Sequence, residues 1–218
     1  DGFLLDGQLA HNLIERFFAL PNPLNMPEEK VLAWFDETFH QVIETQGAVL
    51  LMHGRRSDYE GLRYRLRRAL TRLLVQISAA KVEMVQSELE LNGHYRGGEI
   101  LGFADLVLTN RQGRQAIVDM RWGGTKKYAA KLADNTHLQL GIYAELLRQK
   151  SGAWPDVGYY ILAEGKLFVQ QNNYFPNGNV VNKIIDESTP HLYERFKATH
   201  AWRAELLRQG KIEVVLEH

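Results

Sequence analysis

The stretch GFADLVLTNRQGRQAIVDMR, residues 102 to 121, decides the fold class of this chain. Alternating and apolar residues on both sides of the turn at 110–113 are typical of two strands joined by a hairpin. A further alternating run precedes them, separated by Asn92-Gly93 and Gly97-Gly98. The pattern therefore predicts an antiparallel meander with strands near 82–91, 99–108 and 115–121.

Two acidic residues lie at corresponding places on the last two of these strands. Asp105 follows Gly102-Phe103-Ala104, and Asp119 follows the apolar run Ala116-Ile117-Val118. Neighbouring strands lie about 4.8 Å apart, so two carboxylates on one face can share a hard cation such as magnesium. The alternative is that both aspartates are solvated strand-end residues, as exposed aspartates usually are. The two-residue period also turns Arg121 to the face of Asp119.

Helical periodicity and its breaks organise the remaining chain. Apolar residues at three-to-four spacing, ended by prolines or glycines, predict helices over 7–20, 27–47, 58–80, 136–150 and 189–209. Two more strands are predicted at 157–163 and 166–170. This order predicts an α/β fold in which helices flank a sheet. We expect a single domain over 1–215, with a helical elaboration at about 27–80 and a core formed by 7–20 and 81–210.

Composition narrows the possible chemistry and location. The chain has 218 residues, 26 basic and 26 acidic side chains, and no cysteine. Thiolate zinc sites and iron–sulfur ligand sets are therefore excluded within these residues, so a metal must bind oxygen or imidazole. No apolar run approaches the roughly 20 residues that cross a bilayer, which favours a cytoplasmic protein with no membrane contact. The final Leu216-Glu217-His218 is typical of a tag remnant.

One basic stretch stands out in this neutral chain. Seven arginines against two acids leave a local charge of +5 between residues 55 and 72. Such a stretch can bind phosphate, although charge runs are more often solvated faces. The candidate DNA contacts within it are Arg63, Arg67, Arg68 and Arg72.

Four motifs in order resemble the RecB-like branch of the PD-(D/E)XK nucleases. They are His11 with Glu15, Gly102-x-x-Asp105, Asp119-x-Arg121, and Gln139-x-x-x-Tyr143, and they span about residues 7 to 165. The resemblance implies a restriction-endonuclease-like mixed sheet flanked by helices. It also implies a metal site in which His11, Asp105 and Asp119 are ligands and the carbonyl of Met120 completes the shell. Magnesium is the expected ion, and manganese can substitute.

The resemblance assigns further residues to the site. Glu88 is a candidate for the strand glutamate that precedes the glycine motif, with Glu83 and Glu90 as alternative registers. Gln139 and Tyr143, four residues apart on one helix side, are expected to line the DNA-facing site. Without the family pattern, His11 on an apolar helix would be read as a satisfied core histidine.

The chain departs from the family at Arg121, where the motif ends in lysine. Arginine cannot act as a base at neutral pH, because its pKa exceeds about 12. Three interpretations remain open: a bound cation activates water without a lysine, Lys126 or Lys127 substitutes from the adjacent glycine-containing loop, or the chain is an inactive descendant.

These observations favour a metal-dependent DNA nuclease, with exonuclease activity, that serves DNA repair or recombination. A helicase domain or subunit is the expected partner beside DNA, and relatives carry iron–sulfur cysteines in flanking segments. The alternative is a catalytically impaired domain that binds DNA or acts as a scaffold of a helicase–nuclease complex. A third possibility is a helical adaptor whose arginines are only solvated, and this adaptor would show no salt-dependent DNA binding.

Overall fold

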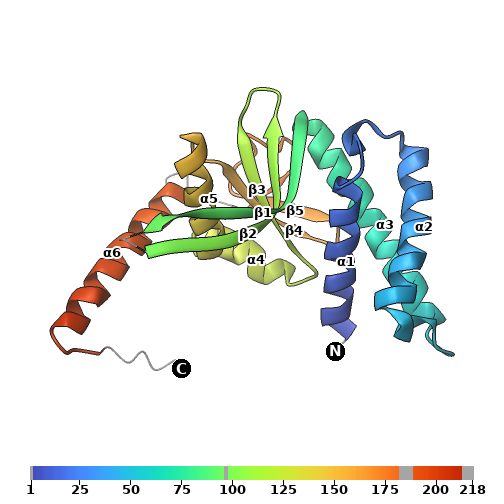
Figure 1. Ribbon diagram of the computed structural model, residues 1–218, viewed down its shortest axis with the longest axis horizontal. Helices are drawn as coiled ribbons and strands as arrows, with labels where there is room; N and C mark the ends of the chain where they lie inside the picture. Colours follow the sequence, from blue (N-terminus) through green and yellow to red (C-terminus); the bar gives the residue numbers. More distant parts are fainter. Residues whose placement is uncertain (1, 96–97, 182–188, 213–218) are drawn as a thin grey trace.

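The computed structural model describes residues 2–95, 98–181 and 189–212 and shows three layers (Figure 1). A six-stranded mixed sheet lies between two groups of helices in this described part of the chain. The strands follow the order β1 (Val82–Tyr95), β2 (Gly98–Asn110), β3 (Gln115–Arg121), β4 (Asp156–Ile161), β5 (Lys166–Val169) and β6 (Asn179–Val180). The predicted α/β fold with a mixed, helix-flanked sheet is confirmed.

Three amphipathic helices cover one face of the sheet. They are α1 (Gly2–Phe18), α2 (Glu28–Gln46) and α3 (Arg56–Ala79). Phe17, Phe35 and Leu66, one from each helix, are almost fully buried in one cluster with Val118 and Met120 of β3. Burying each such side chain contributes about 1.5–3 kcal/mol. The helices of the expected elaboration therefore share a core with α1 and the sheet.

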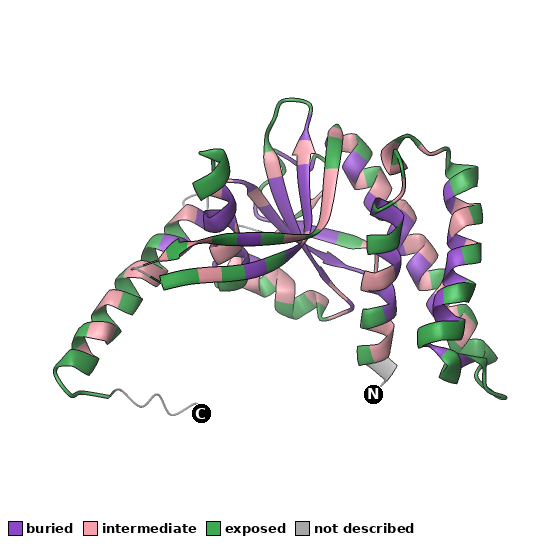
Figure 2. Cartoon of the chain, viewed as in Figure 1, coloured by how far each residue is buried: buried purple, intermediate pink, exposed green. Residues whose placement is uncertain are grey.

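The opposite face carries the later helices. They are α4 (Thr125–Ala133), α5 (Leu138–Ser151) and α6 (Thr189–Arg208). Leu132, Leu140 and Ala144 form a second buried cluster with Ile117 of β3, and α6 packs mainly on α5. Figure 2 shows the buried residues concentrated in the sheet between the two helical groups. Because odd and even positions of β3 point to opposite faces, one apolar strand supplies both cores.

The strand pairing confirms the meander and adds a crossover. β1, β2 and β3 pair antiparallel in sequence, as predicted. β3 then pairs parallel with β4, with Asp119 opposite Tyr159. A parallel pair needs a long connection, and α4 and α5 supply it. The sequence prediction missed α4 because Gly123-Gly124 suggested an open loop, and it missed β6 because two residues are too few to show a period.

The β1–β2 hairpin bends at Glu88, where the backbone φ is 49°. Val85 packs on the first core, whereas Leu89 packs on the second, although residues four apart on a regular strand share one face. The left-handed conformation at Glu88 interrupts the pleat and produces this exchange of faces. The distal half of the hairpin therefore leaves the plane of the sheet and lies over α5 (Figure 1).

Two further expectations concern the membrane and the terminus. Among the described helices, none has the length and hydropathy of a membrane span. The expected tag remnant at 216–218 lies outside the described residues.

Candidate metal centre

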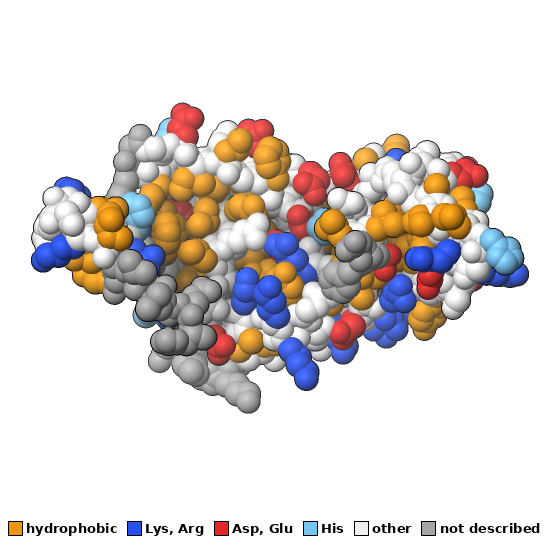
Figure 3. Space-filling model, turned by 90° about the horizontal axis from the view of Figure 1, so that it is seen from below, with side chains coloured by type: hydrophobic (Ala, Val, Ile, Leu, Met, Phe, Trp, Pro, Cys, Tyr) orange, Lys and Arg blue, Asp and Glu red, His pale blue; other side chains and the backbone are white. Residues whose placement is uncertain are grey.

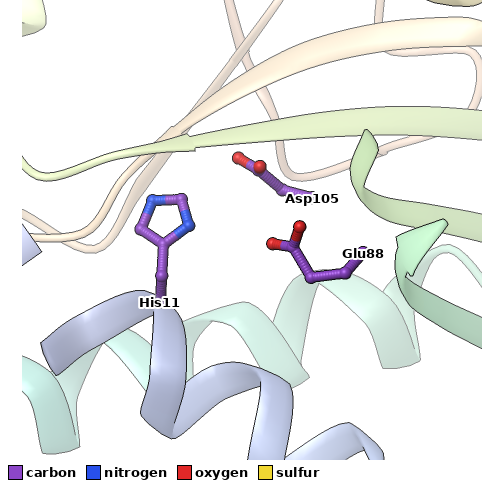
Figure 4. Close-up of side chains that lie close together, drawn as sticks. All are labelled: His11, Glu88 and Asp105. Carbon is purple, nitrogen blue, oxygen red and sulfur yellow. The ribbon is translucent and has the colours of Figure 1, made fainter. Parts of the chain in front are cut away.

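Three potential metal ligands from three elements meet at the bend of the hairpin. His11 comes from α1, Glu88 from β1 and Asp105 from β2, and their side chains point toward one another (Figure 4). One potential ligand atom from each lies within 4.8 Å of the others. Glu88 is opposite Asp105 because the pairs Ser87–Leu106 and Leu89–Ala104 flank them. Of the three glutamates considered from the sequence, only Glu88 belongs to this cluster, and Glu83 pairs with Arg111 at 3.1 Å.

The backbone of Met120 joins this cluster from β3. The Nε2 atom of His11 lies 3.0 Å from the carbonyl oxygen of Met120. The N–H of the same residue donates to Oδ2 of Asp105 at 2.5 Å. The carbonyl that the family resemblance assigns to the metal shell therefore lies beside the imidazole assigned to the same shell.

Asp119 lies next to this cluster but has a different partner. It is 3% exposed, and its Oδ1 accepts a hydrogen bond from Nη2 of Arg121 at 2.8 Å. A second contact joins Nε of Arg121 to Oδ2 of Asp119. The structure thus groups Glu88 with Asp105 and His11, whereas Asp119 is held by Arg121.

Burial raises the pKa of both aspartates to about 6. The main cause in each case is desolvation, and the charge of Asp105 adds to the effect at Asp119. Burial in a low-dielectric site disfavours the charged form of each carboxyl group. A bound cation offsets this cost, because it stabilises the negative charge. Imidazole nitrogen, carboxylate oxygen and a backbone carbonyl are also a donor set that suits a divalent ion. The residues present therefore fit a metal.

Arg121 begins a hydrogen-bonded chain to the glutamine motif. Its Nη2 donates to Oε1 of Gln139 at 2.9 Å, and Nε2 of Gln139 donates to the hydroxyl of Tyr143 at 3.1 Å. The expectation that Gln139 and Tyr143 share one side of their helix is confirmed by this contact. Their role toward DNA stays a prediction.

Gly102 explains why the strand and helix motifs occur together. A Cβ atom at Gly102 would lie 2.4 Å from Cε1 of Tyr143. The ring of Tyr143 therefore packs directly on the backbone of β2, which a larger residue would prevent. This contact fixes the helix that carries Gln139 relative to the strand that carries Asp105.

A groove of about 610 Å³ opens beside the cluster. It is lined by α1, by residues 120–123 and by Tyr128 of α4, and His11 and Arg121 form part of its wall. Three cations surround the ring of Tyr128: Arg121 at 5.5 Å, Lys127 at 5.7 Å and Lys131 at 5.6 Å. Lys126 is exposed on the same helix. Lys131 was missed from the sequence, although its i,i+4 spacing from Lys127 was a usable signal.

Other residues of the chain already bind three of the four candidate DNA-binding arginines of α3. Arg63 pairs with Asp36 at 2.8 Å. Arg68 and Arg72 donate to the carbonyls of Ala163 and Glu164, at 2.8 and 2.9 Å. These contacts fasten α3 to α2 and to the turn after β4. The expected DNA contacts of these arginines stay predictions.

Comparison with known proteins agrees with this geometry. No curated protein matches the chain. A family match covers residues 5–215, which is nearly the whole chain, and includes every element described above apart from the first three residues of α1. Members of this family are generally metal-dependent nucleases. With its helix-flanked mixed sheet and clustered His11, Glu88 and Asp105, the chain belongs to the PD-(D/E)XK nuclease superfamily.

Proposed function

We propose that this chain is the nuclease domain of a RecB-like DNA-processing enzyme, an exonuclease that hydrolyses phosphodiester bonds in DNA repair or recombination. The observation that carries the proposal is the convergence of His11, Glu88 and Asp105 beside the carbonyl of Met120. This arrangement occurs in a chain of the PD-(D/E)XK superfamily, whose members are generally nucleases.

The proposed ion is magnesium, with manganese as a substitute. His11, Asp105, Asp119 and the Met120 carbonyl would hold it, and Glu88 would lie at its edge. When bound, the cation supplies Lewis acidity, lowers the pKa of water and offsets phosphate charge. Asp119 can serve as a ligand only if it gives up part of its contact with Arg121.

The residues of the chain have separate roles in this proposal. Arg121 stabilises negative charge that develops on the phosphate, because its guanidinium is a permanent cation beside the cluster. Gln139 orients Arg121 through the 2.9 Å hydrogen bond, and Tyr143 holds Gln139. Lys127 and Lys131 attract the DNA backbone at the mouth of the groove.

One observation favours a second candidate, a catalytically impaired domain that binds DNA or acts as a scaffold. The motif position carries the guanidinium of Arg121, which is already protonated at neutral pH and so cannot accept a proton, and this group is bound by Asp119 and Gln139. In either case we propose DNA as substrate or ligand, a helicase domain or subunit as partner, and a cytoplasmic location.

Calorimetric titration with manganese tests the metal site. Asp105→Asn and Asp119→Asn are expected to weaken manganese binding by at least about tenfold, because a hard cation needs anionic oxygen. Glu83→Gln is the matched control, since Glu83 is an exposed acidic residue of the same sheet, on β1, and pairs with Arg111. Unchanged affinity in the Asp105 and Asp119 variants would disprove the site.

A cleavage assay separates the two candidate functions. With magnesium or manganese, the wild type is expected to degrade end-labelled linear DNA and to leave circular DNA intact. Cutting of circles would contradict the exonuclease assignment. Metal binding and DNA binding without any cleavage would support the impaired domain.

A further inference from the structure

An exposed aromatic residue lies on the β1–β2 hairpin, two positions before Asp105 of the metal cluster. Phe103 is 49% exposed and precedes Asp105 by two residues. The residues on either side of Phe103 point the other way, because Gly102 meets Tyr143 of α5 and Ala104 lies in the second core. Phe103 and Asp105 therefore leave the strand on the same side, about 6.6 Å apart along its axis.

A packing role does not explain this ring. Phe103 belongs to neither buried cluster, and within the described part of the chain its ring has no aromatic or cation partner. Its neighbour across the hairpin is Glu90, a charged residue rather than an apolar one. Leu101, the next residue on the same face, is also 60% exposed.

The charges around Phe103 suit a base better than a phosphate. Between residues 88 and 105 the chain has one basic residue, Arg96, against four acidic ones, Glu88, Glu90, Glu99 and Asp105. An acidic ribbon repels a phosphate backbone, whereas a neutral base can lie on an aromatic ring. The cations lie on another side of the cluster, where Arg121 and Lys127 surround Tyr128. Figure 3 shows basic side chains gathered near the middle of the face that carries α4.

We propose that Phe103 is a base-stacking residue that positions an unpaired nucleotide at the metal cluster. The base lies on the hairpin and its phosphate reaches the cluster, within the span of one nucleotide from Phe103 to Asp105. A base in a duplex has no free face to offer, so the substrate class is single-stranded DNA or a frayed end. This inference rests on the proposed function and specifies its substrate.

Binding of two oligomers of equal length tests the inference. One is oligothymidylate and the other is an abasic strand, both with phosphorothioate links that slow cutting, and affinity is measured by fluorescence anisotropy with manganese. The abasic strand keeps the phosphate charge and lacks every base. The wild type is expected to prefer oligothymidylate by at least about fivefold, the low end of base–aromatic stacking.

Three variants identify the ring responsible. Phe103→Ala is expected to remove most of that preference without changing affinity for the abasic strand, and Phe103→Trp should keep it. Trp202→Ala is the matched control, because Trp202 is an aromatic residue of similar exposure, 51%, on α6. An undiminished preference in Phe103→Ala, or an equal loss for both strands, would overturn the proposal.

The outcome is separable from that of the nuclease assignment. Base-dependent binding that requires Phe103 in a chain that cuts nothing would sustain the stacking role and refute the nuclease. Cleavage of DNA by a chain whose Phe103→Ala variant keeps the full preference would sustain the nuclease and refute the stacking role.

Discussion

The guanidinium of Arg121 has three neighbours: the carboxylate of Asp119, the amide oxygen of Gln139 and the ring of Tyr128. A lysine has one ammonium group and cannot make the paired contact that arginine makes with Asp119. A lysine at position 121 would therefore leave Asp119 without this paired contact. Arginine at this position holds Asp119 and the glutamine motif together.

Substitution of Arg121 tests how water is activated. Arg121→Ala is expected to lower the cleavage rate by about tenfold or more, because a preorganised cation beside the reacting phosphate is lost. Arg121→Lys should raise the rate above wild type, since a desolvated ammonium can exchange a proton and a guanidinium cannot. Steady-state cleavage of end-labelled DNA measures both effects.

Lys126 and Lys127, which lie in the first turn of α4 rather than in the expected loop, provide the contrast to Arg121. Lys126→Ala and Lys127→Ala are expected to keep the chemical rate at saturating DNA. If Lys127→Ala abolishes cutting while Arg121→Lys changes nothing, then a lysine of α4 replaces the motif lysine and the role given to Arg121 is wrong.

At the level of elements, the site depends on how α5 lies on the hairpin. Gly102 of β2 receives the ring of Tyr143, and Gly93 of β1 lies close to Gln149 of the same helix. The side-chain amide of Gln149 also hydrogen-bonds the backbone of His94 in both directions, at 3.3 Å. Close backbone approach thus fixes α5 against the strands that carry Glu88 and Asp105.

Gly102→Ala is expected to destabilise the protein by about 1–3 kcal/mol, the usual range for overpacking. The added methyl group would lie 2.4 Å from the Tyr143 ring, so the ring must move. Urea denaturation measures the change, and the cost should shrink when Tyr143→Ala is also present. Gly61→Ala in α3 is a control in which the new Cβ meets only Arg65 Nη1 at 3.4 Å. Equal costs in both backgrounds would show that Tyr143 is not the obstacle.

A buried histidine connects the three helices behind the sheet. The ring of His137 lies 3.1 Å from the hydroxyl of Thr189 in α6 and 3.4 Å from the carbonyl of Lys131 in α4. Burial lowers its pKa to about 4, and the charge of Arg195 adds to the effect. The imidazole is therefore neutral in the folded protein at neutral pH.

His137 should make stability depend on pH between about 6.5 and 4. Below pH 6.5 the unfolded chain binds a proton at this residue that the folded chain does not bind until about pH 4, so acid favours unfolding. The contribution of His137 to the loss of stability between pH 7.5 and 5 is about 2 kcal/mol. Urea denaturation of the wild type and a His137 variant at the two pH values measures it.

Comparison between variants isolates this effect. The pKa values of Asp105 and Asp119 are raised in the folded protein. Ionisation of these two groups therefore lowers the free energy of unfolding as pH rises, which is opposite in sign to the effect of His137. His137→Gln should remove about 2 kcal/mol of acid sensitivity relative to wild type. Identical pH dependence in wild type and His137→Gln would contradict the assignment.

On the scale of the whole molecule, zero net charge conceals a separation of charge. Acidic side chains gather at the hairpin and the cluster, and basic ones gather around Tyr128 and along α3. A neutral protein gains little from bulk attraction to DNA, so local cations must supply the phosphate contacts. Arg68 and Arg72 are already used to hold α3 on the turn after β4.

The arginines of α3 should therefore divide into two groups. Arg68→Ala is expected to lower the free energy of unfolding by about 1.5–3 kcal/mol, since a hydrogen bond from a charged donor to the carbonyl of Ala163 is lost. Arg67→Ala should leave stability nearly unchanged and reduce the log–log salt slope of single-strand binding by about 0.7. The loss should be equal for all sequences, because phosphate contacts carry no base information. A sequence-dependent loss, or an unchanged slope, would contradict the DNA contact.

The sequence by itself determined the types of most elements and the meander, because strand alternation and helical spacing are local properties, although it missed α4 and β6. The order of its motifs, through the family resemblance, indicated the residues of the site. It placed His11, Asp105 and Met120 together, and the structure brings them into contact. Tertiary structure decided the rest. The choice of Glu88 over Glu83 and Glu90 depends on a backbone bend, and the pairing of Asp119 with Arg121 depends on side-chain positions that no spacing reveals. A run of arginines in a sequence is equally ambiguous. The sequence does not show whether an arginine is bound within the protein, as Arg68 is by a carbonyl oxygen 95 residues away.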